Sequence, residues 1–112
     1  MNFLGIFIGI DRYHDPSIRE LAGAKRDAKA LWALFLDTIP SFKATLLTDE
    51  DATCFNIIQA LDNSLGTATS EDVVIISFSG HGTRDHRLAT FDTSKQNLPN
   101  TTISMQEIAS RL

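Results

Sequence analysis

The stretch Ser77–His86, SFSGHGTRDH, places a histidine between two glycines, directly after the apolar run Val73–Ile76. A histidine side chain changes protonation near neutral pH, so His81 can act as a general acid or base. Gly80 and Gly82 carry no side chain, so a substrate can approach the backbone and the Gly82 N–H can donate to an anion. The pattern therefore predicts a catalytic histidine beside an oxyanion donor. The alternative is a turn histidine held by a local hydrogen bond.

The residues around His81 offer no nucleophile of a familiar kind. Ser79 lies two residues before it but lacks the G-x-S-x-G elbow of serine hydrolases. The only cysteine, Cys54, falls on a predicted helix, where a buried packing role is the better interpretation. The spacing of His81, Asp85 and His86 suits no pair of metal ligands on a helix or strand, so we predict no metal. No phosphate-binding G-x-x-x-x-G-K occurs, and we predict no cofactor.

An alternation of strands and helices is predicted to position these groups. Apolar runs predict strands over residues 3–10, 44–47 and 73–78. Amphipathic helices are predicted from residue 24 to Pro40 and from the acid cluster Thr48–Asp51, which is predicted to open the second helix. A calcium site is the alternative for this cluster, but its spacing does not match a calcium loop. A hairpin near 88–91 and a helix opened by the capping box Ser104-Met-Gln-Glu107 follow. This order predicts an α/β fold with a mostly parallel sheet and helices on both faces.

The predicted sheet brings His81 to a favourable place. In open α/β sheets, ligands bind beyond the carboxyl ends of the strands, where the strand order reverses. If the strand 3–10 lies between the other two, Asp11 and residues 79–82 flank that crevice. A receiver-like domain with Asp11 as phosphoacceptor would share this fold class, but the Ser-Gly-His-Gly sequence does not support it.

Length and composition exclude several classes of protein. A chain of 112 residues fits one domain, and its net charge of −4 disfavours a nucleic-acid partner. A lone cysteine forms no internal disulfide, which favours a reducing, cytoplasmic compartment. The apolar start MNFLGIFIGI is too short to span a membrane and has no basic segment before it. We expect no membrane association.

The third predicted strand lacks a neighbour. Residues 73–78 have the composition of a buried, central strand, and the last predicted helix is followed by no strand that could pair with it. We expect a further strand on a downstream segment or on a separate chain. The alternative is a small three-stranded sheet whose edge is covered.

Three stretches resemble the caspase-like cysteine peptidases: Phe7–Asp11 with Tyr13, Leu21–Ala28 and Phe78–Gly82. They occur in the family's order over nearly the whole chain, and the bacterial metacaspase-like branch is the more similar one. The resemblance implies a caspase-type three-layer α/β sandwich. It also implies that residues 1–112 are its histidine-bearing, N-terminal, large-subunit-like portion only, incomplete at the C-terminus.

The resemblance implies a cysteine endopeptidase that acts by thiol acyl transfer. His81 matches the family's catalytic histidine, and Gly82 matches the glycine whose N–H helps to hold the oxyanion. The family's cysteine ends the next parallel strand, about 50 residues beyond the histidine. It is therefore expected downstream of Leu112 or on a partner chain, and this chain alone is expected to be inactive. The expected partners are this cysteine-bearing remainder and a protein or peptide substrate; no cofactor is implied.

The resemblance also bears on specificity. Leu21 occupies the position of the arginine with which caspases bind aspartate. Asp27 and Ser79 match two positions that line the first pocket of metacaspases, which cut after arginine or lysine. Cleavage after arginine or lysine is therefore expected, although Asp27 is equally explained as an acid in the first turn of a helix. A catalytically dead caspase-like binding module is the alternative function.

Overall fold

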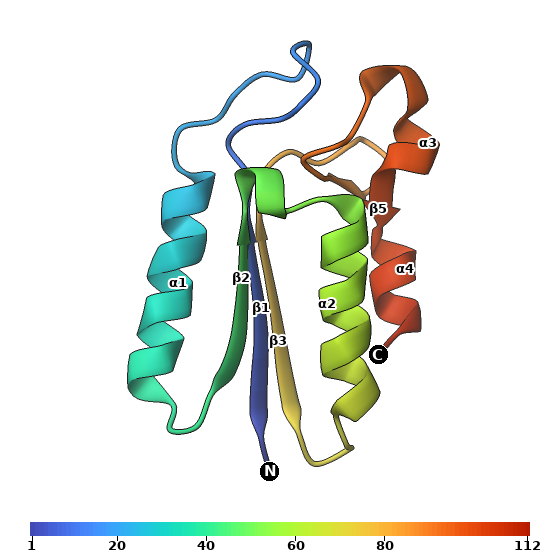
Figure 1. Cartoon of the computed structure of the whole chain (residues 1–112). Helices are drawn as coiled ribbons and strands as arrows, with labels where there is room; N and C mark the ends of the chain where they lie inside the picture. Colours follow the sequence, from blue (N-terminus) through green and yellow to red (C-terminus); the bar gives the residue numbers. More distant parts are fainter.

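A parallel sheet of three strands forms the middle layer of the computed structural model, which describes residues 1–112 (Figure 1). Its strands are β1 (Phe3–Gly9), β2 (Lys43–Thr48) and β3 (Val73–Ser79), in the order β2-β1-β3. Both neighbouring pairs are parallel. The predicted α/β class and parallel sheet are confirmed, and the structure meets the condition that the first strand lies between the other two.

Helices cover both faces of this sheet and give the fold its three layers. Helix α1 (Ala24–Thr38) lies on one side, and α2 (Cys54–Thr67) and α4 (Met105–Ser110) lie on the other (Figure 1). Helix α2 begins later than the acid cluster suggested, because residues Asp49–Asp51 form a separate 3₁₀ turn, η1. The side chain of Thr53 caps α2 by accepting a hydrogen bond from the Asn56 N–H.

Strand β1 supplies the core on both of its faces. Its alternate residues Ile6 and Ile8 are buried in the main core, together with residues of α2 and α4. The intervening Phe7 packs its ring against those of Phe35 and Phe42 on the α1 side, at centroid distances of 5.7 and 6.1 Å. Burial on both faces explains why β1 reads as a nearly continuous apolar run.

Gly9 lets α1 approach the end of β1. A Cβ atom added there would lie 2.5 Å from the Ala24 carbonyl oxygen and 2.6 Å from the Ala28 Cβ. Any larger residue would force the start of α1 away from the sheet. This close contact fixes the N-terminal end of α1 beside the carboxyl end of β1, where the candidate site lies.

A second, two-stranded antiparallel sheet lies beyond β3. Strand β4 (Arg87–Ala89) pairs with β5 (Thr102–Ser104), and η2 (Lys95–Asn97) and α3 (Leu98–Thr101) connect them. The hairpin predicted near 88–91 is present only as an isolated antiparallel bridge, between Gly82 and Leu88, and the pairing of β4 with β5 was not predicted. The predicted capping box is confirmed: the Ser104 hydroxyl accepts from the Glu107 N–H, and the Glu107 carboxylate accepts from the Ser104 N–H.

Strand β3 lies at an edge of the parallel sheet. It pairs with β1 only, and most of its residues are half-buried. As expected from the sequence, β3 has no second neighbour among residues 1–112, and its predicted central place depends on a further strand from elsewhere. Beside β3 runs a groove of about 380 Å³ that is lined only by hydrophobic residues. We call this the β3 groove; it is lined by Val74, Ile76, Phe78, Leu88, Met105, Ile108 and Leu112.

Candidate active site

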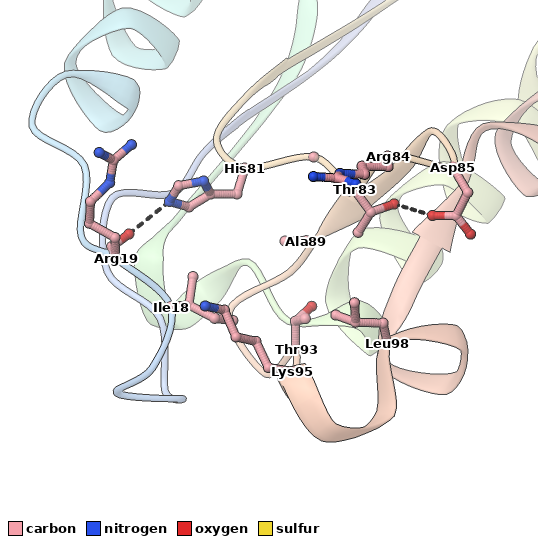
Figure 2. Close-up of a pocket in the computed structure, with 11 residues that line it drawn as sticks. Ile18, Arg19, His81, Thr83, Arg84, Asp85, Ala89, Thr93, Lys95 and Leu98 are labelled. Carbon is pink, nitrogen blue, oxygen red and sulfur yellow. Dashed lines mark hydrogen bonds between the residues drawn. The ribbon is translucent and has the colours of Figure 1, made fainter.

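The imidazole of His81 is held in one orientation just beyond the end of β3. Its Nε2 lies 2.7 Å from the backbone carbonyl oxygen of Arg19, in the loop between β1 and α1 (Figure 2). A carbonyl oxygen only accepts hydrogen bonds, so Nε2 carries the proton and donates. In the neutral ring, Nδ1 is then the acceptor. This tautomer leaves Nδ1 available to exchange a proton with a substrate or a nucleophile.

Tyr13 fixes the backbone on which His81 sits. The Tyr13 hydroxyl accepts a hydrogen bond of 2.9 Å from the His81 N–H, and the two rings lie 5.4 Å apart. Burial raises the pKa of Tyr13 above its ordinary value, so the hydroxyl stays neutral. A Cβ atom added to Gly80 would lie 2.9 Å from this oxygen. Gly80 is therefore needed to let Tyr13 reach the His81 backbone.

Gly82 presents a backbone N–H that has no acceptor in the protein. Two hydrogen bonds join its neighbours to β4: Thr83 N–H to the Arg87 carbonyl at 2.9 Å, and Ala89 N–H to the His81 carbonyl at 3.0 Å. They leave Gly82 opposite Leu88 in an isolated antiparallel bridge, with its own N–H directed away from β4. This N–H makes none of the protein's hydrogen bonds. It is therefore available to an oxyanion.

The chain's own packing does not require glycine at position 82. A Cβ atom added there would have only an ordinary contact of 3.5 Å, with the Arg87 carbonyl oxygen. No glycine of the protein has a positive φ, so backbone strain does not demand one either. Gly80 and Gly82 thus differ: the first makes room for Tyr13, and the second leaves open space beside His81.

His81 and Gly82 border a cavity of about 510 Å³ (Figure 2). We call it the histidine cavity. Its walls come from the β1–α1 loop, from the turn after β3 and from the segment between β4 and α3. The lining residues are Ile18, Arg19, His81, Gly82, Thr83, Arg84, Asp85, Ala89, Thr93, Lys95 and Leu98.

The other two predicted site residues lie outside this cavity. Asp27 is exposed in the first turn of α1, and Ser79 is the half-buried last residue of β3. The carbonyl of Ser79 accepts from the Ile10 N–H at 3.0 Å. The structure thus brings His81 and Gly82 together at one cavity and leaves Asp27 and Ser79 apart from it.

Two further acids at this end of the sheet hold the backbone together. The Asp11 carboxylate accepts from the N–H groups of Ala24 and Lys25, at 2.8 and 3.2 Å, and so satisfies the start of α1. Asp49, which is 2% exposed, accepts from the N–H groups of Asp11 and Arg12 at 2.9 and 3.2 Å. Because the Asp11 oxygens are engaged in capping, its phosphoacceptor role is disfavoured.

The only cysteine is not part of the candidate site. Cys54 begins α2, is half-buried and packs against the main core. Burial, and then the nearby charge of Asp92, raise the pKa of its thiol above the ordinary value, so it is a poor nucleophile. No group of three or more histidine, cysteine, aspartate or glutamate side chains is placed to hold a metal ion.

Sequence reasoning missed the roles of Tyr13 and of the Arg19 carbonyl. From the sequence, Tyr13 is recognised only as part of a motif. Which backbone carbonyl accepts a hydrogen bond from His81 cannot be inferred from residue types. Gly80 was the available signal, because a glycine next to a candidate catalytic residue often marks a close approach by another group. No helix of the structure combines the length and the apolar character needed to cross a membrane.

Comparison with known proteins identifies the family and the fold of the chain. A family model described as "Caspase domain" matches residues 4–110. A crystal structure of a protein from Geobacter sulfurreducens superposes with a TM-score of 0.78 at 18% identity, over 100% of this chain and 45% of that one. At this identity the likeness shows the fold alone, and this chain spans less than half the length of that protein. No curated protein matches the chain. Since the family model covers nearly every residue, the chain belongs to the caspase-domain family of cysteine peptidases.

Proposed function

We propose that this chain supplies the acid–base histidine and one oxyanion donor of a cysteine endopeptidase. The observation that carries the proposal is the pairing of a fixed imidazole with an unused N–H. The Arg19 carbonyl directs the His81 tautomer, and the Gly82 N–H next to it has no acceptor in the protein. Acyl transfer needs these two groups at one site.

The reaction proceeds through an acyl-enzyme. A cysteine thiolate attacks the carbonyl carbon of the peptide bond, and the Gly82 N–H stabilises the negative charge that develops on the oxygen. His81 gives a proton to the leaving amine as the C–N bond breaks. It then takes a proton from water, whose oxygen attacks the thioester and releases the new carboxylate and the thiol.

The attacking cysteine belongs to a remainder of the peptidase domain that is outside this chain. Residues 1–112 form the large-subunit-like part, and we place the cysteine at the end of a strand paired with β3. The free edge of β3 and the apolar β3 groove beside it support this location, because an unpaired edge next to apolar side chains favours a further strand. Such a strand would end next to His81. The complete enzyme would be a metacaspase-like protein of the cytoplasm.

The proposed substrate is a protein or peptide cut after arginine or lysine. Asp27 and Ser79 support this choice by their match to the metacaspase pattern. The Asp27 carboxylate is exposed and makes no hydrogen bond or ion pair, so it is available to a basic side chain. Leu21 supports it further, because a leucine cannot pair with a substrate aspartate as an arginine would.

A series of peptides that differ only in the residue before the cleaved bond tests this specificity. We expect the complete enzyme to favour arginine and lysine over aspartate and glutamine in kcat/KM. Asp27→Asn should lower kcat/KM for the arginine peptide about tenfold, because it removes the charge that a bound guanidinium would meet. Asp37→Asn, an exposed change in the last turn of the same helix, is the control. Preferred cleavage after aspartate, or no response to Asp27→Asn, would contradict the proposal.

A binding module without catalysis is the second candidate function. It is favoured by one observation: the chain's single thiol, Cys54, does not line the histidine cavity. Under this alternative the cavity would bind a peptide and release it intact. Covalent labelling of a cysteine of the complete protein by a thiol-reactive peptide separates the two functions.

A further inference from the structure

The residues that line the histidine cavity carry an excess of positive charge. Three of its lining residues are cations, Arg19, Arg84 and Lys95, and none of them forms an ion pair. The single acid of the lining, Asp85, is engaged: its carboxylate accepts from the Thr83 hydroxyl and from Arg87 Nε at 3.0 Å. This local excess of positive charge contrasts with the chain's net charge of −4.

These cations come from separate walls around an apolar floor. Arg84 lies in the turn after Gly82, and Lys95 comes from η2 on the opposite side of the cavity (Figure 2). Ile18, Ala89 and Leu98 supply the apolar surface between them. Asp15 accepts a hydrogen bond from the backbone N–H of Lys95. The Asp15 carboxylate also interacts with the charge of Lys95 but forms no ion pair with it, so the ammonium group can still bind an anion. A chain of methylene groups that ends in an anion suits such a cavity.

The position of the cavity relative to His81 indicates which part of a substrate would enter it. His81 protonates the leaving amine, so the amine must lie next to His81 when the bond breaks. His81 also forms part of the cavity wall. The residues proposed to hold the side chain before the cleaved bond, Asp27 and Ser79, do not line this cavity. The histidine cavity therefore faces the part of the peptide that leaves with the amine.

We propose that the histidine cavity binds an acidic side chain, glutamate or aspartate, that follows the cleaved bond of the substrate. This inference rests on the proposed peptidase function and adds a second determinant of specificity to it. The volume of about 510 Å³ is within the range of small-ligand pockets and accommodates such a side chain. Arg84 and Lys95 are the specificity-determining residues.

Paired peptides test this preference in the complete enzyme. Each pair is identical except for glutamate or glutamine directly after the cleaved bond, so that shape is conserved and charge differs. We expect kcat/KM to be about fivefold higher for the glutamate peptide at low salt, and the ratio to fall as salt screens the charges. In Arg84→Gln/Lys95→Gln, the ratio should approach about one. Lys43→Gln removes an exposed cation from the start of β2 and should leave the ratio unchanged.

Binding of the leaving-group peptides separates this proposal from the peptidase function. NMR shifts of the Gly82 and His81 amides would be followed while the glutamate or glutamine peptide is added. Tighter binding of the glutamate peptide, lost in the double variant, supports the cavity proposal even if no peptide is cut, and failure to cut would then overturn the peptidase function alone. Cleavage with equal rates and equal binding for both peptides would overturn the cavity proposal and leave the peptidase function standing.

Discussion

Two groups of polar residues lie at the carboxyl end of the parallel sheet. In one group the polar atoms are hydrogen-bonded within the protein, and in the other some of them are not. Around Asp11 and Asp49, the carboxylates are engaged with backbone N–H groups of the same chain. Around His81 and Gly82, one N–H and one ring nitrogen have no partner in the protein, and the cations that line the cavity form no ion pair.

The difference shows how function can be located among polar residues. Both groups lie in loops beside the same strand ends, and both contain residue types that occur in active sites. Satisfied groups stabilise the fold, because a buried polar group without a partner is costly. Unsatisfied groups at an open cavity are available to a ligand. The first group is therefore structural, and the second is the candidate for chemistry.

Removing the imidazole should give the largest effect. His81→Ala in the complete enzyme is expected to lower kcat about 10³-fold or more, because no other group can protonate the leaving amine. The free energy of unfolding should change by less than about 1 kcal/mol, since the half-buried ring makes one hydrogen bond. Peptide turnover and urea unfolding measure the two quantities. His86→Asn, which suits the φ of 62° at that position, is the control. Normal turnover of His81→Ala would refute the assignment.

Asp49 should show the reverse behaviour. Asp49→Ala leaves two backbone N–H groups without their acceptor in a buried place, and we expect a loss of about 3 kcal/mol in the free energy of unfolding. Glu50→Ala, an exposed change in the same η1 turn, should have almost no effect. Urea denaturation measures the free energy of unfolding of both variants. Equal stability of the two would mean that Asp49 is not the structural anchor described above.

The two glycines beside His81 should differ in stability. Gly80→Ala forces a methyl group to 2.9 Å from the Tyr13 hydroxyl and should destabilise the fold by about 1 to 3 kcal/mol. Gly82→Ala meets no atom closer than 3.5 Å and should stay within about 0.5 kcal/mol of the parent protein. Thermal unfolding of the two variants measures both changes in stability. A larger loss for Gly82→Ala would show that this glycine is structural, and the contrast would be lost.

The smallest effect concerns the thiol of Cys54. Because burial and Asp92 raise its pKa, a smaller fraction is thiolate at pH 8 than in a free cysteine. Alkylation by iodoacetamide should be roughly fivefold slower than for a cysteine peptide, and should accelerate as the pH rises through the raised pKa. In urea the difference should vanish. Alkylation faster than that of the peptide would make Cys54 an activated nucleophile.

The sequence was sufficient for the parts of the fold that depend on local pattern. The apolar runs of β1 and β3 and the capping box at Ser104 each leave a signature in neighbouring residues. The histidine between two glycines was visible in the same way. These signals led to the parallel α/β sheet and to two of the candidate site residues, His81 and Gly82.

Long-range contacts were not accessible from local pattern. The hydrogen bond from Tyr13 to the His81 backbone joins residues far apart in the chain, as does that from His81 to the Arg19 carbonyl. The pairing of β4 with β5 involves a partner on the far side of a loop, so only the nearer contact of β4, with the turn after β3, could be predicted. The charge of the histidine cavity likewise depends on three separate segments coming together.

The most direct test of the central claim is denaturing intact-mass analysis of the purified protein after reaction with a thiol-reactive peptide that ends in arginine. The account predicts that the adduct is carried by a cysteine outside residues 1–112, on a second polypeptide or on a longer chain. It also predicts that His81→Ala slows the labelling. An adduct on Cys54, or no adduct on any chain in the sample, would contradict the claim that this chain supplies the histidine of a cysteine peptidase.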